Sequence, residues 1–295
     1  MSPGRTDPAL ARVLEDLRPR LHRYCARMAG SVIDGEDVMQ EAFLKILDSF
    51  PGFAAVDNPG GWVFRVTHRV ALDFLRRRAR LSPLAGEEEM MDMADERSEV
   101  DARLATAAGL ATFMQLSVPQ RSTVILMDVL GYTLDEIAEI TATSQAAVKS
   151  SLHRGRASLR ELAAAPDEPH ARRLDERQAA LLAAYAARFN ARDFAGVRDL
   201  LAEEVRLEVV ARTTLRGRDA VAGTYFANYA ASTDWRVAPG LVEGRPALLV
   251  SNPDPSAPDD IVYFILLEWR DGLVVSGRDF RHASYVMDGA EVETI

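Results

Sequence analysis

The chain has few of the residues that build disulfides, metal centres and membrane spans. Cys25 is the single cysteine among 295 residues, which excludes an intramolecular disulfide and a metal centre made of several cysteines. No run of about 18 apolar residues occurs, so a membrane-spanning helix is not expected. No signal-like apolar stretch follows the first residues. The sequence therefore predicts a cytoplasmic protein with no metal, no other cofactor and no membrane partner.

Lysine is also rare, and the basic residues are unevenly distributed. There are 33 arginines and only two lysines, and the net charge is −9. Residues 60–80 nevertheless hold six arginines against the single acid Asp73, a local charge of 6 − 1 = +5. A cationic segment inside an acidic chain is typical of a surface that follows nucleic-acid phosphates.

Residues 61–80 have the periodicity of an amphipathic helix, at about 100° per residue. One stripe carries the basic side chains Arg65, His68, Arg69 and Arg76. The opposite stripe carries the apolar side chains Val63, Val66, Val70 and Phe74. This pattern fits a helix that packs on a core and binds a polyanion, although a solvated helix with a basic end has the same pattern.

A second helical segment contains two short helices joined by a tight turn. Thr133 and Glu136 form a capping box that starts the first helix, and Thr143 or Ser144 can cap the second. The second helix has the buried stripe Val148, Leu152 and Leu159. Its outward side chains are Ala146, Lys149, Ser150 and His153. A basic second helix led by small polar residues favours insertion into the DNA major groove over an ordinary helical hairpin.

Composition divides the chain into three domains and two linkers. Residues 1–80 and 104–165 are predicted to be helical domains. Residues 81–103 hold eight acids and two arginines, a charge of 2 − 8 = −6, which is typical of a linker. Residues 166–173 form a second linker with two prolines. Residues 174–295 are predicted to form a third domain of helices followed by strands.

Three motifs together resemble one known family. Residues 34–46 are similar to the region 2.2 helix of bacterial sigma-70 factors of the extracytoplasmic-function group, and residues 61–80 to their region 2.3–2.4. Residues 116–160 resemble their region 4. The motifs stand in the family's order and cover roughly residues 9–163. The resemblance implies two all-α domains, a region 2 helical bundle and a region 4 helix-turn-helix.

The resemblance also implies that the partners are promoter DNA and core RNA polymerase, through its β′ clamp helices and its β flap. The residues expected to bind the clamp helices share one helix face and are Asp37, Gln40, Glu41 and Leu44. The side chains expected to point into the domain are Met39, Ala42, Phe43 and Ile46. Polar groups around one apolar residue suit a hot spot, although a solvated acidic face has the same periodicity.

By the same resemblance, region 2.3–2.4 reads and melts the −10 promoter element. The candidate −10 residues are Trp62, Arg65, His68, Arg69, Arg76 and Arg77. Arginines can hold phosphates, and Trp62, Phe64 or His68 can stack on an unpaired base. Residues 50–59 would shape the pocket for a flipped base, and Trp62 fits a core position equally well.

Region 4 would bind the −35 element. The candidate −35 residues are Ser144, Gln145, Lys149, Ser150, His153, Arg154 and Arg156. The three basic side chains at 149, 154 and 156 are expected on phosphates, and Gln145 and His153 nearest to base edges. Two departures from the family weaken the expected −35 binding. The turn reads Thr141-Ala142-Thr143 instead of carrying a glycine, and Ser151 replaces a basic residue.

The last domain resembles a SnoaL-like, ketosteroid-isomerase-like α+β cone, which some extracytoplasmic-function sigma factors carry at the C-terminus. The helices are expected at 175–190, 193–201 and 217–229. The strands of a curved antiparallel sheet are expected at 205–210, 234–239, 241–251, 260–269 and 272–282.

An enzyme of this fold needs a carboxylate base and an oxyanion hole in an apolar pocket. The candidates are Asp234, Tyr263, Glu268, Asp279 and Tyr285, and no spacing singles out a pair. We therefore expect no enzyme but a sigma factor regulated in cis by this domain. A helix-turn-helix regulator whose last domain senses a small ligand or has enzymatic activity is the alternative, and an anti-sigma factor or small ligand remains open as a partner.

Overall fold

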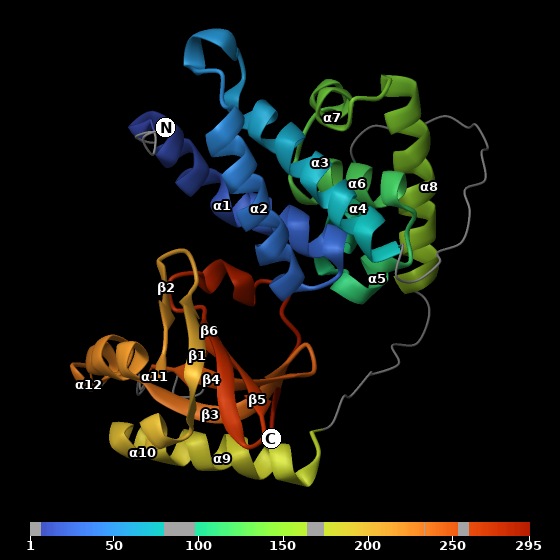
Figure 1. Ribbon diagram of the computed structural model, residues 1–295. Helices are drawn as coiled ribbons and strands as arrows, with labels where there is room; N and C mark the ends of the chain where they lie inside the picture. Colours follow the sequence, from blue (N-terminus) through green and yellow to red (C-terminus); the bar gives the residue numbers. More distant parts are fainter. Residues whose placement is uncertain (1–6, 80–97, 164–173, 233, 253–259) are drawn as a thin grey trace. The chain divides into compact units, whose positions relative to one another are not determined.

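The computed structural model describes residues 7–79, 98–163, 174–232, 234–252 and 260–295. The chain divides into two compact units, residues 1–168 and 169–295. The first is all-helical, and the second combines helices with one sheet (Figure 1). The expected fold class, two all-α domains followed by an α+β domain, is confirmed. Among the described residues, no helix has the length and apolar character to cross a bilayer.

The first unit begins with three long helices. They are α1 (Pro8–Ala29), α2 (Val32–Ser49) and α3 (Pro59–Ala79), with a 3₁₀ turn η1 (Phe53–Ala55) before α3. Ser31 caps α2, and Gly30 ends α1 in the left-handed conformation at φ 77°. A Cβ at Gly35 would lie 2.6 Å from the backbone of Ala26. Only glycine therefore allows α2 to approach α1 this closely.

The core of this bundle follows the predicted pattern on α2. Met39, Ala42 and Ile46 are fully buried, and Phe43 is nearly so, which confirms the inward face. On α3, Val63 and Val70 are buried as expected, whereas Val66 and Phe74 are only half-buried. The basic stripe of α3 is therefore not opposed by one continuous buried stripe.

The rest of the first unit is built from shorter helices around a long final one. They are α4 (Glu99–Ala107), α5 (Leu110–Met114), α6 (Val118–Val124), the π-helical turn η2 (Ile125–Val129), α7 (Leu134–Thr141) and α8 (Gln145–Ala163). The capping box of Thr133 and Glu136 is present, and the Ser144 Oγ accepts from the Ala147 N–H at 3.2 Å. Both helices of the predicted helix-turn-helix therefore start where their caps indicate.

One boundary prediction is wrong. The acidic linker was expected to reach residue 103, but α4 begins at Glu99 behind the N-cap Ser98. Asp101, counted among the linker's acids, is buried in ion pairs with Arg156 and Arg160 of α8. These contacts fix the segment as helix. Residues 81–97 of that linker lie outside the described residues.

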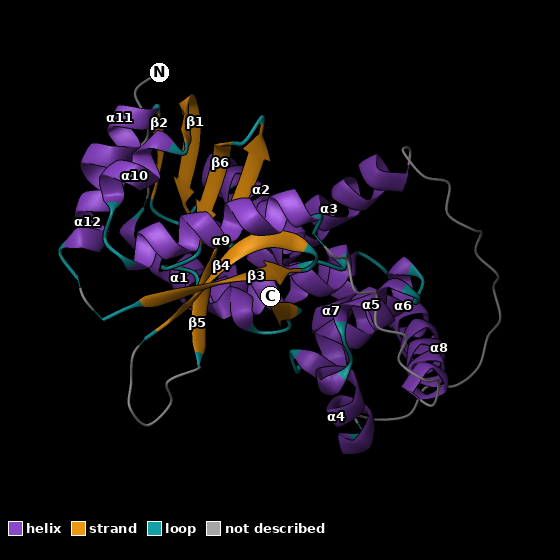
Figure 2. Ribbon diagram, turned by 90° about the horizontal axis from the view of Figure 1, so that it is seen from below, coloured by secondary structure: helices purple, strands orange, loops and turns teal. Residues whose placement is uncertain are grey.

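The second unit packs helices on a seven-stranded sheet (Figure 2). Its helical elements are α9 (Glu176–Asn190), α10 (Phe194–Asp199), α11 (Arg218–Ala220), η3 (Val221–Phe226), α12 (Ala227–Ala230) and the 3₁₀ turn η4 (Ser284–Met287). Its strands are β1 (Leu201–Val209), β2 (Thr213–Arg216), β3 (Arg236–Val242), β4 (Arg245–Ser251), β5 (Ile261–Arg270), β6 (Leu273–Asp279) and β7 (Val292–Thr294).

The sheet order is β2-β1-β6-β5-β4-β3-β7. The expectation of a purely antiparallel sheet is wrong, because β1 pairs with β6 in parallel and the sheet is therefore mixed. The turn between β3 and β4 lies at Glu243 and Gly244, both with positive φ, and not at residue 240. The short edge strands β2 and β7 were not predicted. Helix α9 crosses the sheet against β3 and β4 and buries Tyr185 and Phe189 in an aromatic core.

Candidate polymerase and nucleic-acid interface

The outer face of α2 presents apolar and acidic side chains. Leu44 is 66% exposed, and Leu47 is 42% exposed one turn further on, so two exposed leucines lie close together on this face. Asp37 is exposed, and Gln40 and Glu41 are half-buried beside them. An exposed apolar side chain inside a polar rim is the arrangement of a protein-docking spot. The polymerase-binding role of Asp37, Gln40, Glu41 and Leu44 stays a prediction.

Ion pairs connect this face to the end of α3. Arg77 donates from Nη2 to the Glu41 carboxylate at 2.7 Å, and Lys45 contacts the same carboxylate at 3.0 Å. The hydrogen bond from Arg77 is the main cause that lowers the pKa of Glu41. Arg78 similarly contacts Asp34 at 3.2 Å. Arg77, predicted to bind a phosphate, is thus shared with the predicted polymerase face.

The remaining basic residues of α3 differ in exposure. Arg69 and Arg76 are exposed, Arg65 is half-buried, and Arg76 makes a surface ion pair with Asp73 at 3.1 Å. Because an exposed ion pair contributes little free energy, Arg76 can leave Asp73 and bind a phosphate at small cost. Arg69 and Arg76 are therefore the side chains on this helix best placed to meet a polyanion.

The prediction that His68 faces outward is wrong. His68 is 5% exposed, and the Tyr24 hydroxyl lies 2.6 Å from its Nδ1. Burial, with the charges of Arg69 and Arg76, lowers the pKa of His68 to about 4. The ring is neutral near pH 7, and a buried ring cannot stack on a base without first leaving Tyr24.

Trp62 takes an intermediate position. It is half-buried, and its ring packs edge-to-face on Phe50 at 5.4 Å, while Phe50 packs on Phe53 at 4.9 Å. This aromatic group holds the loop 50–59 against the start of α3. The part of the Trp62 ring that stays exposed is available for stacking.

On α8 the predicted −35 residues separate into two groups. Ser144, Gln145, Lys149 and His153 are exposed, and Ser150 and Arg154 are half-buried. Gln145 also hydrogen-bonds to Asp135 of α7. Arg156 is 4% exposed and ion-paired with Asp128 at 2.6 Å. The expected phosphate contact of Arg156 is therefore wrong, because its guanidinium is enclosed by protein.

The three-helix bundle and the helix-turn-helix pack together inside the first unit. Arg121 of α6 donates to the Met28 carbonyl at the end of α1 at 2.6 Å. Burial lowers the pKa of Arg121 to about 10, so it stays charged and complements the helix dipole there. The Phe64 and Tyr132 rings meet at 5.0 Å.

A cavity of about 590 Å³ lies between α3 and the helix-turn-helix. His68 and Leu72 line it from α3, and Ala147, Ser151 and Arg154 line it from α8. The inner sides of the two candidate DNA-binding helices therefore face each other, while Arg69, Lys149 and His153 remain exposed.

The second unit encloses a carboxylate among tyrosines. Asp279 accepts hydrogen bonds from Tyr225 and Tyr229, each at 2.8 Å, and from the Arg281 N–H at 2.7 Å. Tyr263 bonds to the Tyr229 hydroxyl at 3.0 Å. Of the five residues considered for this domain, the structure brings together only Tyr263 and Asp279. Asp234 and Glu268 are exposed and Tyr285 is half-buried.

The sequence alone did not identify Tyr225 and Tyr229 as partners of Asp279. It also did not identify Asp101 and Asp128, which form ion pairs with arginines of α8. The two tyrosines are four residues apart, so the helical period was a usable signal that both share one face. No local signal identified the two aspartates, because their arginine partners are distant in sequence.

Three family models match the chain. The model described as sigma-70 region 2 matches residues 13–81, sigma-70 region 4 matches residues 110–159, and the SnoaL-like domain matches residues 182–277. The first two cover the three-helix bundle and the helix-turn-helix. The third covers most of the second unit.

Similar proteins agree with these matches. The ECF RNA polymerase sigma factor SigG of Mycobacterium tuberculosis is 30% identical over 66% of this chain and 60% of SigG. SigE of Mycolicibacterium smegmatis is 32% identical over 48% of this chain and 56% of SigE. The chain therefore matches less than two thirds of the length of these two relatives. SigM of M. tuberculosis is 32% identical over 48% of this chain and 71% of SigM.

Among solved structures, the M. tuberculosis extracytoplasmic function sigma factor SigJ is similar at 22% identity and a TM-score of 0.36. The alignment covers 91% of this chain and 95% of SigJ. The family models and the match to SigM define the class of protein. The chain belongs to the sigma-70 family of RNA polymerase sigma factors, in its extracytoplasmic-function group, and carries a SnoaL-like C-terminal domain.

Proposed function

We propose that this chain binds core RNA polymerase in the cytoplasm, directs it to a two-part promoter and melts the −10 element. The observation that carries the proposal is the adjacency of two surfaces. The exposed α2 face around Leu44 is joined to the basic end of α3 through Glu41 and Arg77. A DNA activator without a polymerase-binding role has no need for such an exposed apolar face beside its basic helix.

The α2 face suits the β′ clamp helices of polymerase as its partner. Leu44 supplies the apolar centre, and Asp37, Gln40 and Glu41 supply acceptors for arginine or amide donors. Region 4 would contact the β flap. Membership of the sigma-70 family supports both contacts.

DNA binding divides between two exposed basic surfaces. Arg69 and Arg76 would hold phosphates of the −10 element, and the exposed part of Trp62 would stack on an unpaired base. Lys149 would hold a phosphate at −35, with Gln145 and His153 nearest to base edges. The closed packing around His68 would open during this binding.

The C-terminal domain would regulate in cis and perform no covalent chemistry. The Asp279 carboxylate is 1% exposed, and its oxygens accept from two tyrosines and one backbone N–H. A catalytic base must reach a substrate proton, and this carboxylate is enclosed by its own protein. Regulation would act on polymerase access or on the spacing of regions 2 and 4.

Runoff transcription with purified core polymerase tests the proposal. We expect the full chain to yield promoter-specific transcripts from genomic templates without the housekeeping sigma factor. The double variant Asp37→Ala with Gln40→Ala should lower core binding and transcript yield together, because it removes polar groups from the docking face. Asp16→Ala, an exposed acid on α1, is the matched surface control.

Absence of specific transcripts, with or without residues 174–295, would overturn the sigma assignment. Transcripts that appear only when the housekeeping sigma factor is added would instead identify a helix-turn-helix activator.

A further inference from the structure

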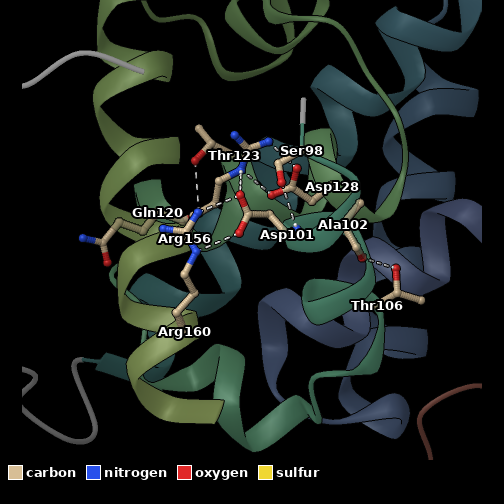
Figure 3. Close-up of polar contacts among 9 residues, drawn as sticks. All are labelled: Ser98, Asp101, Ala102, Thr106, Gln120, Thr123, Asp128, Arg156 and Arg160. Carbon is tan, nitrogen blue, oxygen red and sulfur yellow. Dashed lines mark hydrogen bonds and ion pairs between the residues drawn. The ribbon is translucent and has the colours of Figure 1, made fainter. Parts of the chain in front are cut away.

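Four charged side chains alternate in sign at the centre of the helix-turn-helix domain (Figure 3). Arg156 donates from Nε at 3.0 Å and from Nη2 at 2.6 Å to the two oxygens of Asp128. Asp101 of α4 lies 3.7 Å from the same Nε. Asp101 in turn accepts two hydrogen bonds from Arg160, at 2.9 and 2.8 Å. We call Asp101, Asp128, Arg156 and Arg160 the anchor network.

Burial makes the centre of this network stiff. Arg156 is 4% exposed, and Asp101 and Asp128 are each 3% exposed, whereas the Arg160 side chain is 56% exposed. A bidentate guanidinium–carboxylate pair fixes both the distance and the relative orientation of the two side chains. Removing one buried partner leaves the other charge uncompensated. Arg156 is therefore bound to the scaffold from two sides and does not face solvent.

The network lies in the C-terminal half of α8, and the exposed basic side chains Lys149 and His153 lie in its N-terminal half. Lys149 and Arg156 are seven residues apart and thus on nearly the same stripe of the helix. Lys149 is exposed, while Arg156 is buried against η2 and α4. The outer face of the N-terminal half of α8 is exposed and can enter a groove, and the C-terminal half is held by the buried ion pairs.

Gly155, next to Arg156, allows α8 to approach α6 closely. A Cβ at Gly155 would lie 2.7 Å from Val124 Cγ2 and 3.2 Å from the Gln120 carbonyl oxygen. Asp128 is presented from the π-helical turn η2, where the Leu130 N–H donates to the Ile125 carbonyl. Close approach at Gly155 and paired charges at Arg156 thus hold α8 against α6, η2 and α4.

We propose that Asp128 and Asp101, acting through Arg156, set the direction in which α8 enters the −35 major groove. This inference rests on the proposed function, and it makes Asp101, Asp128 and Arg156 positioning residues that touch no DNA. Base recognition by a helix depends on its angle in the groove, so loosening the network impairs discrimination of bases. Phosphate binding by Lys149 tolerates a change of angle better, because a long flexible side chain can follow the backbone.

The test compares holoenzymes made from core polymerase and full-length variants. The probes are the strongest promoter fragment found by runoff mapping and the same fragment with its −35 element scrambled. Two quantities are measured over a range of salt: the ratio of the two affinities, and the slope of log affinity against log salt. The variants are Arg156→Gln, Asp128→Asn and their double, with Lys149→Gln as the matched basic control on the same helix.

We expect Arg156→Gln and Asp128→Asn each to lower the affinity ratio about tenfold, the size of one lost base contact. The double variant should fall no further, because both changes remove one interaction. The salt slope should stay at the wild-type value. Lys149→Gln should reduce the magnitude of the salt slope by about one, the value for one lost phosphate contact, and should leave the affinity ratio nearly unchanged.

A lower slope for Arg156→Gln with an unchanged ratio would make Arg156 a phosphate ligand and overturn the proposal. An unchanged ratio in every network variant would overturn it too. A variant that is merely less folded binds both fragments less, so its ratio does not change. If Arg156→Gln and Asp128→Asn fail to fold, the affinity ratio of Asp101→Asn provides the test. This variant should fold, because Arg160, the exposed partner of Asp101, can turn into solvent.

Failure of the proposed function gives a different result. In that case the wild-type holoenzyme itself shows no preference between the two fragments, and Lys149→Gln leaves the slope unchanged.

Discussion

Asp279 is a buried carboxyl group whose surroundings shift its pKa. Burial raises the pKa of Asp279, and the hydrogen bonds from Arg281, Tyr229 and Tyr225 oppose that rise. Burial also raises the pKa of Tyr263 to about 12, so the tyrosines remain donors over the physiological range. The Asp279 carboxyl group is thus buried in a cluster of polar groups beside the aromatic core of the SnoaL-like domain.

This environment predicts a pH-dependent effect of Asp279→Asn. The folded-state pKa lies above the unfolded value of about 3.9, so the folded protein binds the proton more tightly. The resulting stabilisation is present below the unfolded pKa and is lost as pH rises through the folded pKa. The asparagine variant has no such titration. Its loss of stability relative to wild type should therefore be larger near pH 4 and shrink as pH rises.

Urea unfolding at several pH values upward from about 4 measures this difference. Asp234→Asn, at an exposed position of the same domain, is the control. A difference between wild type and Asp279→Asn that stays constant with pH would contradict the assignment.

At the scale of elements, the turn of the helix-turn-helix carries backbone strain. Ala142 ends α7 in the left-handed region at φ 54° and ψ 44°. An L-residue with a Cβ pays roughly 1–2 kcal/mol for this conformation. The glycine common at this place in the family would avoid that cost. The departure noted in the sequence thus has a defined energetic consequence for region 4.

Ala142→Gly should stabilise the helical unit. Relief of the left-handed strain exceeds the added unfolded-state entropy of glycine by about 0.5–1 kcal/mol. A rise of about 2 °C in Tm is expected for a unit of this size. Ala146→Gly, at an exposed helical position four residues later, should lower Tm, because no strain is relieved there and glycine is less stable than alanine inside a helix. Thermal unfolding of both variants is the measurement, and equal shifts of one sign would refute the strain.

Local signals explain which elements were predictable. The capping box of Thr133 and Glu136 starts α7 as expected, and the helical spacing of Val148, Leu152 and Leu159 predicted the buried face of α8. Each signal is local to one helix. The existence of the helices and most of the strands could therefore be derived from sequence.

Interactions between distant residues explain the errors. Arg156 resembled an outward basic residue because its partner Asp128 lies 28 positions away. His68 shared a stripe with arginines, but Tyr24 from α1, 44 positions away, holds it inside. The parallel pairing of β1 with β6 likewise depends on strands far apart in the chain. Periodicity shows which residues share a face, and only tertiary contacts decide what that face meets.

At the scale of the whole molecule, the candidate polymerase and promoter contacts all lie in the first unit. The second unit has its own sheet and aromatic core. Only residues 164–173 connect the last helix of the first unit to the described start of the second. Two domains on one chain meet at an effective concentration that reaches the order of millimolar when the linker between them is short and flexible. Weak contacts then suffice for regulation in cis.

Deletion of residues 169–295 should therefore change transcription. A regulatory coupling of ordinary size shifts promoter affinity or output about fivefold or more, and the direction of the shift distinguishes activation from inhibition. Residues 169–295 supplied as a separate chain at micromolar concentration should not reverse the change, because the effective concentration is lost. Runoff transcription and promoter binding with holoenzymes of the full and shortened chains give both values. Equal output and equal affinity for the two holoenzymes would exclude regulation in cis and leave the SnoaL-like domain to serve a different partner.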